Sequence, residues 1–343
     1  MKTKRNIAVK TLVDSFVLRA PTMDDVAGAV AVANACSIDL IGKPETEEHE
    51  YRNDWQSPTI SMENDLRVIE APNGEIVGYA SVWDVEPHVR IFGRAHVHPA
   101  YKGRGLEDAL DEWLEVRAAQ ALNTAPEGSR VSLLQGAKSV DQDKQILLEQ
   151  RGYTLVRHWF RMLIEMDGSP PPPQFSGEIE IRTLDETQEL RPLILADREI
   201  FRDHWGYVEH PLEEQIEDWK HWIAHDPDHD PRLWFLAVDG NEIAGISLCA
   251  PKLAEDPEMG YVMSLGVRRL WRRQGIALGL LHHSFGEFYR RGTRKVSLDV
   301  DASSLTGATR LYEKAGMHVQ RQSMSYEKVL RDGKDLSTQA VEA

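Results

Sequence analysis

The spacing of hydrophobic residues divides the second half of the chain into a regular order of strands and helices. Short alternations of apolar and polar residues predict strands, and the spacing of Leu278, Leu281, Phe285 and Phe288 predicts a helix. The predicted strands are 178–184, 233–238, 242–249, 261–267, 295–300 and 318–329, and the predicted helices are 186–202, 211–224, 275–291 and 306–315. Asp239-Gly240 between two of these strands predicts a hairpin turn.

The first half of the chain repeats this order. Its predicted strands are 16–19, 66–70, 75–83, 90–97, 130–134 and 154–166, and its predicted helices are 23–35, 106–120 and 143–150. Three landmarks recur at matching places: Gly74 and Gly78 match Gly240 and Gly245, Val97 and Gly105 match Val267 and Gly275, and Arg151-Gly152-Tyr153 matches Ala315-Gly316-Met317. This internal repeat predicts two similar α/β domains instead of one large domain.

A proline-rich segment separates the two repeats. Residues 168–177 contain four consecutive prolines, which favour an extended and stiff spacer. The predicted organisation is an N-terminal domain at 1–167, a linker at 168–177, a C-terminal domain at 178–331 and a polar tail at 332–343.

Composition narrows the classes of partner. The formal net charge of −15 argues against nucleic acid and mildly favours a cationic or neutral substrate, although an acidic surface also serves solubility alone. Cys36 and Cys249 stand in apolar surroundings without a metal or redox spacing, so we expect two buried thiols. The sequence has no signal-peptide pattern and no apolar stretch of membrane length, which predicts a cytoplasmic protein without a membrane partner.

The junction between the predicted strand 261–267 and the following helix has the features of an anion site. Gly275 allows the backbone to approach a ligand closely, and the first N–H groups of a helix lack acceptors within that helix. Arg272 and Arg273 add positive charge beside them, so a pyrophosphate suits the loop. The junction lacks the Gly-Lys-Ser/Thr of a Walker loop and the three glycines of a dinucleotide fingerprint.

The surrounding order of elements resembles the GNAT superfamily of acyl-CoA-dependent N-acyltransferases. The resemblance rests on the Arg-x-x-Gly-x-Ala loop at 272–277 and on Leu311-Tyr312-Glu313-Lys314-Ala315-Gly316-Met317, and it covers 16–166 and 178–330. It implies two tandem GNAT-like α/β domains, each with a mixed, mostly antiparallel sheet flanked by helices. The tandem layout is similar to that of mycothiol synthases, a likeness of architecture that does not define the substrate.

The resemblance implies an acetyl-CoA site in the second half, without a metal. Leu265 would polarise the thioester carbonyl through its N–H, Val267 would bind the pantetheine arm, and the pyrophosphate would lie on Arg272, Arg273, Gln274, Gly275, Ile276 and Ala277. Tyr312 would protonate the departing thiolate, because a phenol with a pKa near 10 suits that step. Ser304 replaces the usual asparagine and would hydrogen-bond CoA.

The general base and the acceptor are less clearly encoded. Glu258 is the first candidate for the base and Asp299 the second, although either carboxylate could be purely structural. The predicted substrate residues are Asp203, His204, Trp205 and Tyr261, and the nearby Trp219, His221 and Trp222 are equally compatible with core packing. The segment 225–230 resembles a metal site in composition, but its prolines indicate a turn.

The first repeat departs from the pattern at two positions. Glu107 stands where the second repeat has Ala277, and its carboxylate would repel a pyrophosphate. Leu148 aligns with Tyr312 and cannot donate a proton. We therefore expect a non-catalytic first domain and, in the second, transfer of acetyl to a small-molecule amine by direct attack in a ternary complex. The alternatives are a peptide or protein amine, or a non-catalytic CoA-binding module, and the chain could be a monomer or a homodimer.

Overall fold

The computed structural model describes residues 10–175, 178–304 and 307–339. The first half contains the strands β1 (Lys10–Thr11), β2 (Val17–Arg19), β3 (Leu66–Glu70), β4 (Ile76–Trp83), β5 (Arg90–Val97), β6 (Val131–Lys138) and β7 (Thr154–Glu165). Its helices are α1 (Val26–Ile41), α2 (Glu48–Gln56), α3 (Met62–Asp65), α4 (Leu106–Ala118) and α5 (Gln142–Gln150). The second half contains the strands β8 (Ile179–Thr183), β9 (Trp234–Asp239), β10 (Glu242–Ala250), β11 (Met259–Val267), β12 (Lys295–Asp301) and β13 (His318–Arg331). Its helices are α6 (Glu186–Phe201), α7 (Leu212–His225), α8 (Ile276–Arg290) and α9 (Ala308–Lys314).

The predicted strands and helices are present, with ends that differ by a few residues. Helix α2 is a helix that the periodicity did not predict. Its sequence is mostly polar, and Tyr51 and Trp55, one turn apart, are its only large buried apolar side chains. Two apolar residues are too few to show the periodic spacing by which the other helices were predicted. Parts of three predicted segments, namely 176–177 of the linker, 306 of a helix and 340–343 of the tail, lie outside the described residues.

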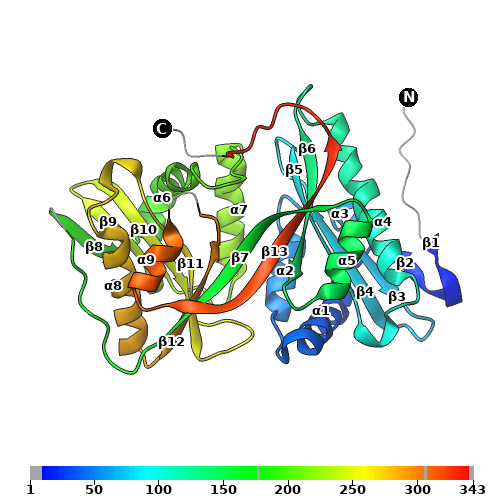
Figure 1. The fold of residues 1–343 in the computed structure, drawn as a ribbon, viewed down its shortest axis with the longest axis horizontal. Coiled ribbons are helices and arrows are strands. Elements are labelled where there is room, and N and C mark those ends of the chain that lie inside the picture. The colour runs from blue at the N-terminus through cyan, green and yellow to red at the C-terminus, as the bar shows by residue number, and fades with distance from the viewer. Residues whose placement is uncertain (1–9, 176–177, 305–306, 340–343) are drawn as a thin grey trace.

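All described strands form one mixed sheet, and its centre is built by an exchange between the halves. The strand order is β1-β2-β3-β4-β5-β6-β13-β7-β12-β11-β10-β9-β8. Strand β13, the last strand of the second half, therefore pairs with β6 of the first half. Strand β7, the last strand of the first half, pairs with β12 of the second half. The two exchanged strands also pair with each other and cross between two lobes (Figure 1).

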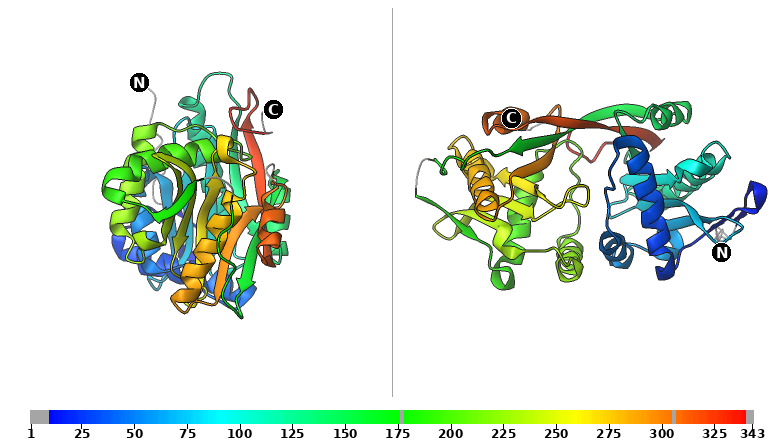
Figure 2. Two further views of the ribbon diagram at one scale, coloured as in Figure 1. Left: turned by 90° about the vertical axis from the view of Figure 1, so that its left-hand side faces the viewer. Right: turned by 90° about the horizontal axis from the view of Figure 1, so that it is seen from below.

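The sheet is mostly antiparallel, as predicted, and helices cover the faces of both lobes (Figure 2). Among the described strands, β5–β6 and β11–β12 are the two parallel pairs. No described helix combines the length and the apolar character that crossing a membrane requires.

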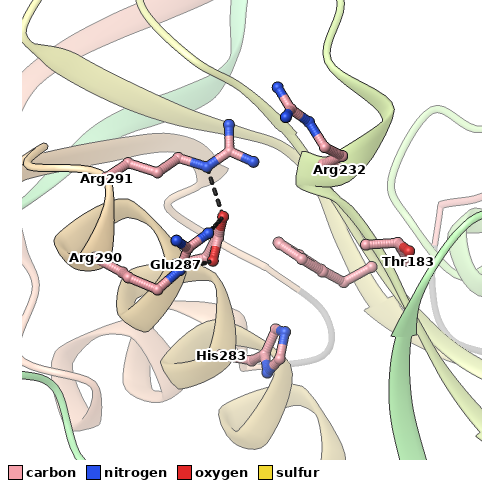
Figure 3. A pocket seen from close by; sticks show the side chains of 7 residues that line it. Thr183, Arg232, His283, Glu287, Arg290 and Arg291 are labelled. Carbon is pink, nitrogen blue, oxygen red and sulfur yellow. Dashed lines mark hydrogen bonds and ion pairs between the residues drawn. The ribbon is translucent and has the colours of Figure 1, made fainter.

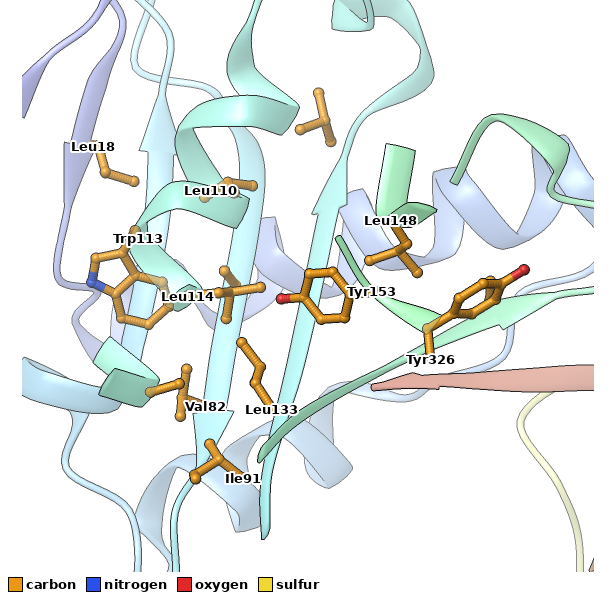
Figure 4. Packing of buried hydrophobic residues seen from close by; sticks show 14 of the residues in the cluster. Leu18, Val82, Ile91, Leu110, Trp113, Leu114, Leu133, Leu148, Tyr153 and Tyr326 are labelled. Atoms are coloured by element: carbon orange, nitrogen blue, oxygen red, sulfur yellow. The ribbon is translucent and has the colours of Figure 1, made fainter. Parts of the chain in front are cut away.

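The hydrophobic cores follow the exchanged sheet and not the order of the chain. Met324 and Tyr326 of β13 lie in the core of the first lobe, where Tyr326 packs near Leu148 and Tyr153 (Figure 4). Met162 of β7 lies fully buried in the core of the second lobe. Each lobe therefore lacks a central strand and part of its core unless the other half of the chain supplies them.

This exchange predicts that the two halves stay together when the linker is cut. A site-specific protease sequence inserted at 170–173 should be cleavable, and the two fragments should then elute as one species in native buffer and unfold in one transition, because β7 and β13 remain paired across the cut. A denaturing gel controls for complete cleavage. Elution of two separate folded fragments would contradict the prediction.

Candidate active site at the fork between β11 and β12

Strands β11 and β12 form a fork that opens a cavity in the second lobe. They pair only from Met259 to Tyr261 on β11 and then separate. The cavity at the opening has a volume of about 190 Å³. Its lining includes Trp159, Phe201, His204, Trp205, Val262, Met263, Leu265, Leu298, Asp299, Val300, Asp301, Ser304, Ala308 and Tyr312. The fork thus brings together the predicted residues Leu265, Tyr312, Ser304 and Asp299.

Tyr312 is positioned on α9 so that its phenol faces this cavity. Its side chain is 7% exposed, and burial raises its pKa to about 12. Within the described part of the chain its hydroxyl makes no hydrogen bond. A neutral, unpartnered phenol beside a cavity can donate a proton to a group that develops negative charge there.

The loop before α8 is shaped to bind an anion. Arg273 and Gly275 both have left-handed backbone conformations, with φ of 63° and 84°, and such alternation turns successive N–H groups toward one point. Within the described residues, the N–H groups of Gln274, Gly275 and Ile276 donate no hydrogen bond to the protein. A non-glycine residue at positive φ is uncommon, and Arg273 adds its exposed positive charge.

Asp203 holds this loop against α6. Its carboxylate is 2% exposed and binds the guanidinium groups of Arg269 and Arg272, the latter at 2.6 Å. The hydrogen bonds from Arg269 and then Arg272 lower the pKa of Asp203 to about 2. Arg272 also donates to the carbonyl of Val267 at 3.0 Å. The carboxylate that we expected to bind an amine is therefore engaged by two arginines and positions the loop instead.

The end of the proline-rich linker lies on the same loop. The carbonyl oxygen of Gln174 would be 3.0 Å from a Cβ atom on Gly275, and the ring of Phe175 would be 2.5 Å from one on Gly279. Both glycines are thus needed for the linker to lie this close. A ligand bound at the loop would contact Gln174 and Phe175 or displace them.

The two predicted bases have different surroundings. Asp299 lies in the cavity wall, where Arg161 of β7 binds both of its oxygens at 2.6 and 2.8 Å and Tyr261 donates a hydrogen bond at 3.0 Å. Burial raises the pKa of Tyr261, and the negative charge of the neighbouring Asp299 raises it further. Glu258 is exposed near the start of β11, at the opposite end of the strand from Leu265, and does not line the cavity.

The loop after α6 forms another wall of the cavity and is held by the first half. The ring of Trp205 contacts the guanidinium groups of both Arg90 and Arg157, which lie 4.4 and 4.3 Å from the ring centroid. Its indole N–H donates to Gln339 of the tail at 3.1 Å. Beside it, burial and then the charge of Arg272 lower the pKa of His204.

A second, aromatic pocket of about 300 Å³ adjoins the cavity, since Met263 lines both. It lies between α2 of the first half and α7 of the second. Its lining consists of Asn53, Asp54, Ser57, Trp83, Asp218, Trp219, His221, Trp222, Trp234, Leu248, Met263 and Ser264. The sequence singled out Trp219, His221 and Trp222, but the residues of α2 were missed because their proximity arises only when the halves meet.

The pocket contains two carboxylates and one unsatisfied donor. Burial raises the pKa of Asp54 to about 6. Asp218 accepts a hydrogen bond from Ser57 at 2.7 Å across the contact between the halves. The indole Nε1 of Trp234 is buried without an acceptor among the described residues. Aromatic walls beside carboxylates suit an organic ammonium group.

The corresponding loop of the first half is similar in shape but differs in chemistry. Gly103 and Gly105 have φ of 75° and 77°, matching Arg273 and Gly275. The N–H of Gly103 donates to the Glu107 carboxylate at 3.2 Å, so the protein supplies its own anion there. The cleft beside this loop has a volume of about 800 Å³.

The charged groups of two other polar features already form ion pairs within the protein. Glu47, His49 and Asp228 could together approach one metal ion, but the ammonium group of Lys252 lies 3.0 Å from both carboxylates. A hollow of about 520 Å³ near the C-terminal end of α8 is lined by Thr183, Arg232, Phe235, His283, Glu287, Arg290 and Arg291 (Figure 3). Glu287 binds both Arg290 and Arg291 there.

Comparisons with known proteins point to one family. Residues 195–317 match the model of the acetyltransferase (GNAT) family. A mycothiol acetyltransferase of Streptomyces bingchenggensis is 26% identical over 266 residues, which are 76% of this chain and 80% of the relative. The crystal structure of a GCN5-related N-acetyltransferase from Sphaerobacter thermophilus is 33% identical and has a TM-score of 0.77, with 95% of this chain and 99% of the other covered. A tandem GNAT protein from the clavulanic acid pathway is 12% identical, with a TM-score of 0.66 and coverage of 93% of this chain and 100% of the other.

The buried carboxylate of Asp203 generates a pH-dependent prediction. Because its folded pKa lies below its unfolded value, its contribution to stability is complete above about pH 4 and is lost as the pH falls toward 2. Asp203→Asn should therefore lower the free energy of unfolding by about 2 kcal/mol at pH 7, and the difference from wild type should shrink in acid.

Urea titrations at pH 7 and pH 3 measure both effects. Glu242→Gln is the matched control, since its partner Arg268 lies 3.3 Å away in an exposed pair that should contribute below about 1 kcal/mol. Equal effects of the two substitutions would refute this account of the loop.

Proposed function

This chain belongs to the GNAT family of acyl-CoA-dependent N-acetyltransferases, and we propose from this premise that its second half transfers an acetyl group from acetyl-CoA to a small-molecule amine by direct attack. The main support is a single arrangement: the fork places Leu265 and Tyr312 around one cavity, and Met263 in the wall of that cavity also lines the aromatic pocket. A thioester in the cavity and an amine in the pocket would meet at Met263.

The loop at 272–277 would hold the diphosphate of the co-substrate. The free N–H groups of Gln274, Gly275 and Ile276 and the charge of Arg273 fit a dianionic group, and Arg272 keeps the loop in place through Asp203. Bound acetyl-CoA supplies the acetyl group as a thioester. In this proposal Leu265 and Val267 bind the arm along β11, the N–H of Leu265 stabilises the developing oxyanion, and Ser304 contributes a polar contact.

Tyr312 would supply the proton that the departing thiolate requires. With a pKa of about 12, the phenol stays protonated throughout the physiological range. This feature favours catalysis over simple CoA binding, because a binding module has no need of a neutral acid at the fork.

The aromatic pocket would bind the acceptor. Its four tryptophans and two carboxylates favour a cationic amine, and the free N–H of Trp234 would suit an oxygen atom of the same molecule. Relatives that are 23–26% identical are named for mycothiol, a small molecule. A pocket of about 300 Å³ lined by residues of both halves suits a small acceptor better than a folded protein.

The first half would act as a scaffold without a reaction of its own. Glu107 engages the loop where a diphosphate would bind, and Leu148 is fully buried in the core at the position of Tyr312. Its proposed contribution is to supply β7 and the α2 wall of the acceptor pocket.

Substitution of Tyr312 tests the proposed acid. Tyr312→Phe should lower kcat about 10²-fold or more, because proton transfer to the thiolate is lost, while acetyl-CoA affinity stays nearly unchanged. Thiol release with a panel of amines measures turnover, and calorimetry measures affinity. Tyr289→Phe on α8 serves as the control; its ring lies 3.8 Å from the guanidinium of Arg294, outside the cavity. An equal loss of affinity and turnover in Tyr312→Phe would count against an acid role.

Substitution of Asp54 tests the acceptor pocket. Asp54→Asn should raise KM for a cationic amine roughly tenfold and leave acetyl-CoA affinity unchanged, because one carboxylate of the pocket is neutralised. Glu217→Gln removes an exposed carboxylate of α7 outside the pocket and should have no effect on KM. Unchanged KM in Asp54→Asn would place the acceptor elsewhere.

A further inference from the structure

A carboxylate on α6 lies directly behind the proposed acceptor pocket. Helix α6 packs tightly on β11 at Gly266, where a Cβ atom would collide with Ile200. One turn before Ile200, Asp197 accepts a hydrogen bond from the hydroxyl of Ser264 at 3.2 Å. Phe201, on the same face of α6, lines the Tyr312 cavity. Asp197 is therefore held between the cavity and the pocket.

Asp197 differs from the other carboxylates near the fork because it has no cationic partner. Asp203 is bound by two arginines and Asp299 by Arg161, whereas Asp197 forms no ion pair within the described residues. Burial raises the pKa of Asp197 to about 6. An ionised carboxylate with such a pKa can accept a proton at neutral pH.

The surroundings of Asp197 contain few groups that titrate. Ser264 faces it from β11, and Tyr207, whose raised pKa depends partly on the charge of Asp197, faces it from the loop after α6. The neighbouring Arg198 on α6 binds Glu209 at 3.1 Å and Gln215 at 2.8 Å. The contacts of α6 with β10 and α7 are formed by an apolar cluster that includes Leu193, Leu236, Ile246, Leu248, Trp219 and Trp222.

We propose that Ser264 and Asp197 form a proton relay that deprotonates the amine acceptor. The inference rests on the proposed function and on the position of Ser264, which lines the acceptor pocket next to Leu265. The ammonium gives one proton to the Ser264 oxygen, and the hydroxyl proton of Ser264 passes to Asp197. The N–H bonding pair becomes the lone pair of a neutral amine, and the carboxylate becomes a carboxylic acid. Ser264 contacts the substrate, and Asp197 acts through it.

The test is the pH dependence of kcat at saturating amine and acetyl-CoA, so that effects on binding do not enter. In wild type, kcat should rise with pH through a limb near 6, because only ionised Asp197 accepts the proton. Asp197→Asn, which keeps the size of the side chain, should lose this limb and lower kcat about 10²-fold. Ser264→Ala should also lower kcat, and Asp197→Glu should restore part of it. Glu199→Gln, on the same helix, should behave as wild type.

The possible outcomes distinguish failure of the relay from failure of the proposed acetyl transfer. Thermal melting and acetyl-CoA affinity verify that each variant is folded. If wild type is active and Asp197→Asn retains both its kcat and the limb near pH 6, the relay is overturned while acetyl transfer stands. If wild type releases no thiol with any amine, the proposed function fails and the relay fails with it.

Discussion

The exchange of β7 and β13 is the constraint on which the rest of the structure depends. Each strand leaves its own half of the chain and completes the sheet of the other, so neither core closes alone. The candidate active-site cavity also depends on the exchange, because residues of the first half contribute to it. Two residues of the first half reach this site: Trp159 lines the cavity, and Arg161 binds Asp299 in its wall. The first half, for which we propose no reaction of its own, thus still contributes residues to the site.

Charged groups reinforce the same junction. Arg161 joins Asp299 to Glu255, and Arg321 of β13 joins Glu255 to Glu45 of the first half. Individual pairs of this kind contribute little, but a partly buried network restricts how the lobes can move relative to one another. The loop bearing Trp205 is held by arginines of β5 and β7 and by the tail. The cavity and the proposed acceptor pocket are accordingly lined by residues from distant parts of the chain.

Local patterns predicted the elements and the loop because both depend on residues close in sequence. A strand followed by a glycine-containing turn and an apolar helix can be identified from about twenty positions. The resemblance of residues 311–317 to the GNAT family singled out Tyr312 as the candidate acid. The role of Asp203 could not be inferred from such local patterns. Its neighbours His204 and Trp205 suggested a substrate site, but its charge is used by Arg269 and Arg272, some 66 and 69 residues away. Asp197 was not singled out at all, since nothing in its local sequence indicates that α6 presses it against Ser264.

By itself the sequence determined the repeat of two α/β units, the anion-binding loop with its altered first copy, and the family resemblance. Hydrophobic periodicity, glycine geometry and short motifs act over one turn or one strand, and they are therefore visible in the chain. Only the tertiary structure decided which half each closing strand completes, which carboxylates near the fork are bound by arginines, and that α2 meets α7 around a pocket. Those outcomes depend on contacts between residues that lie from 66 to more than a hundred positions apart, where burial and charge are set by what the fold brings together.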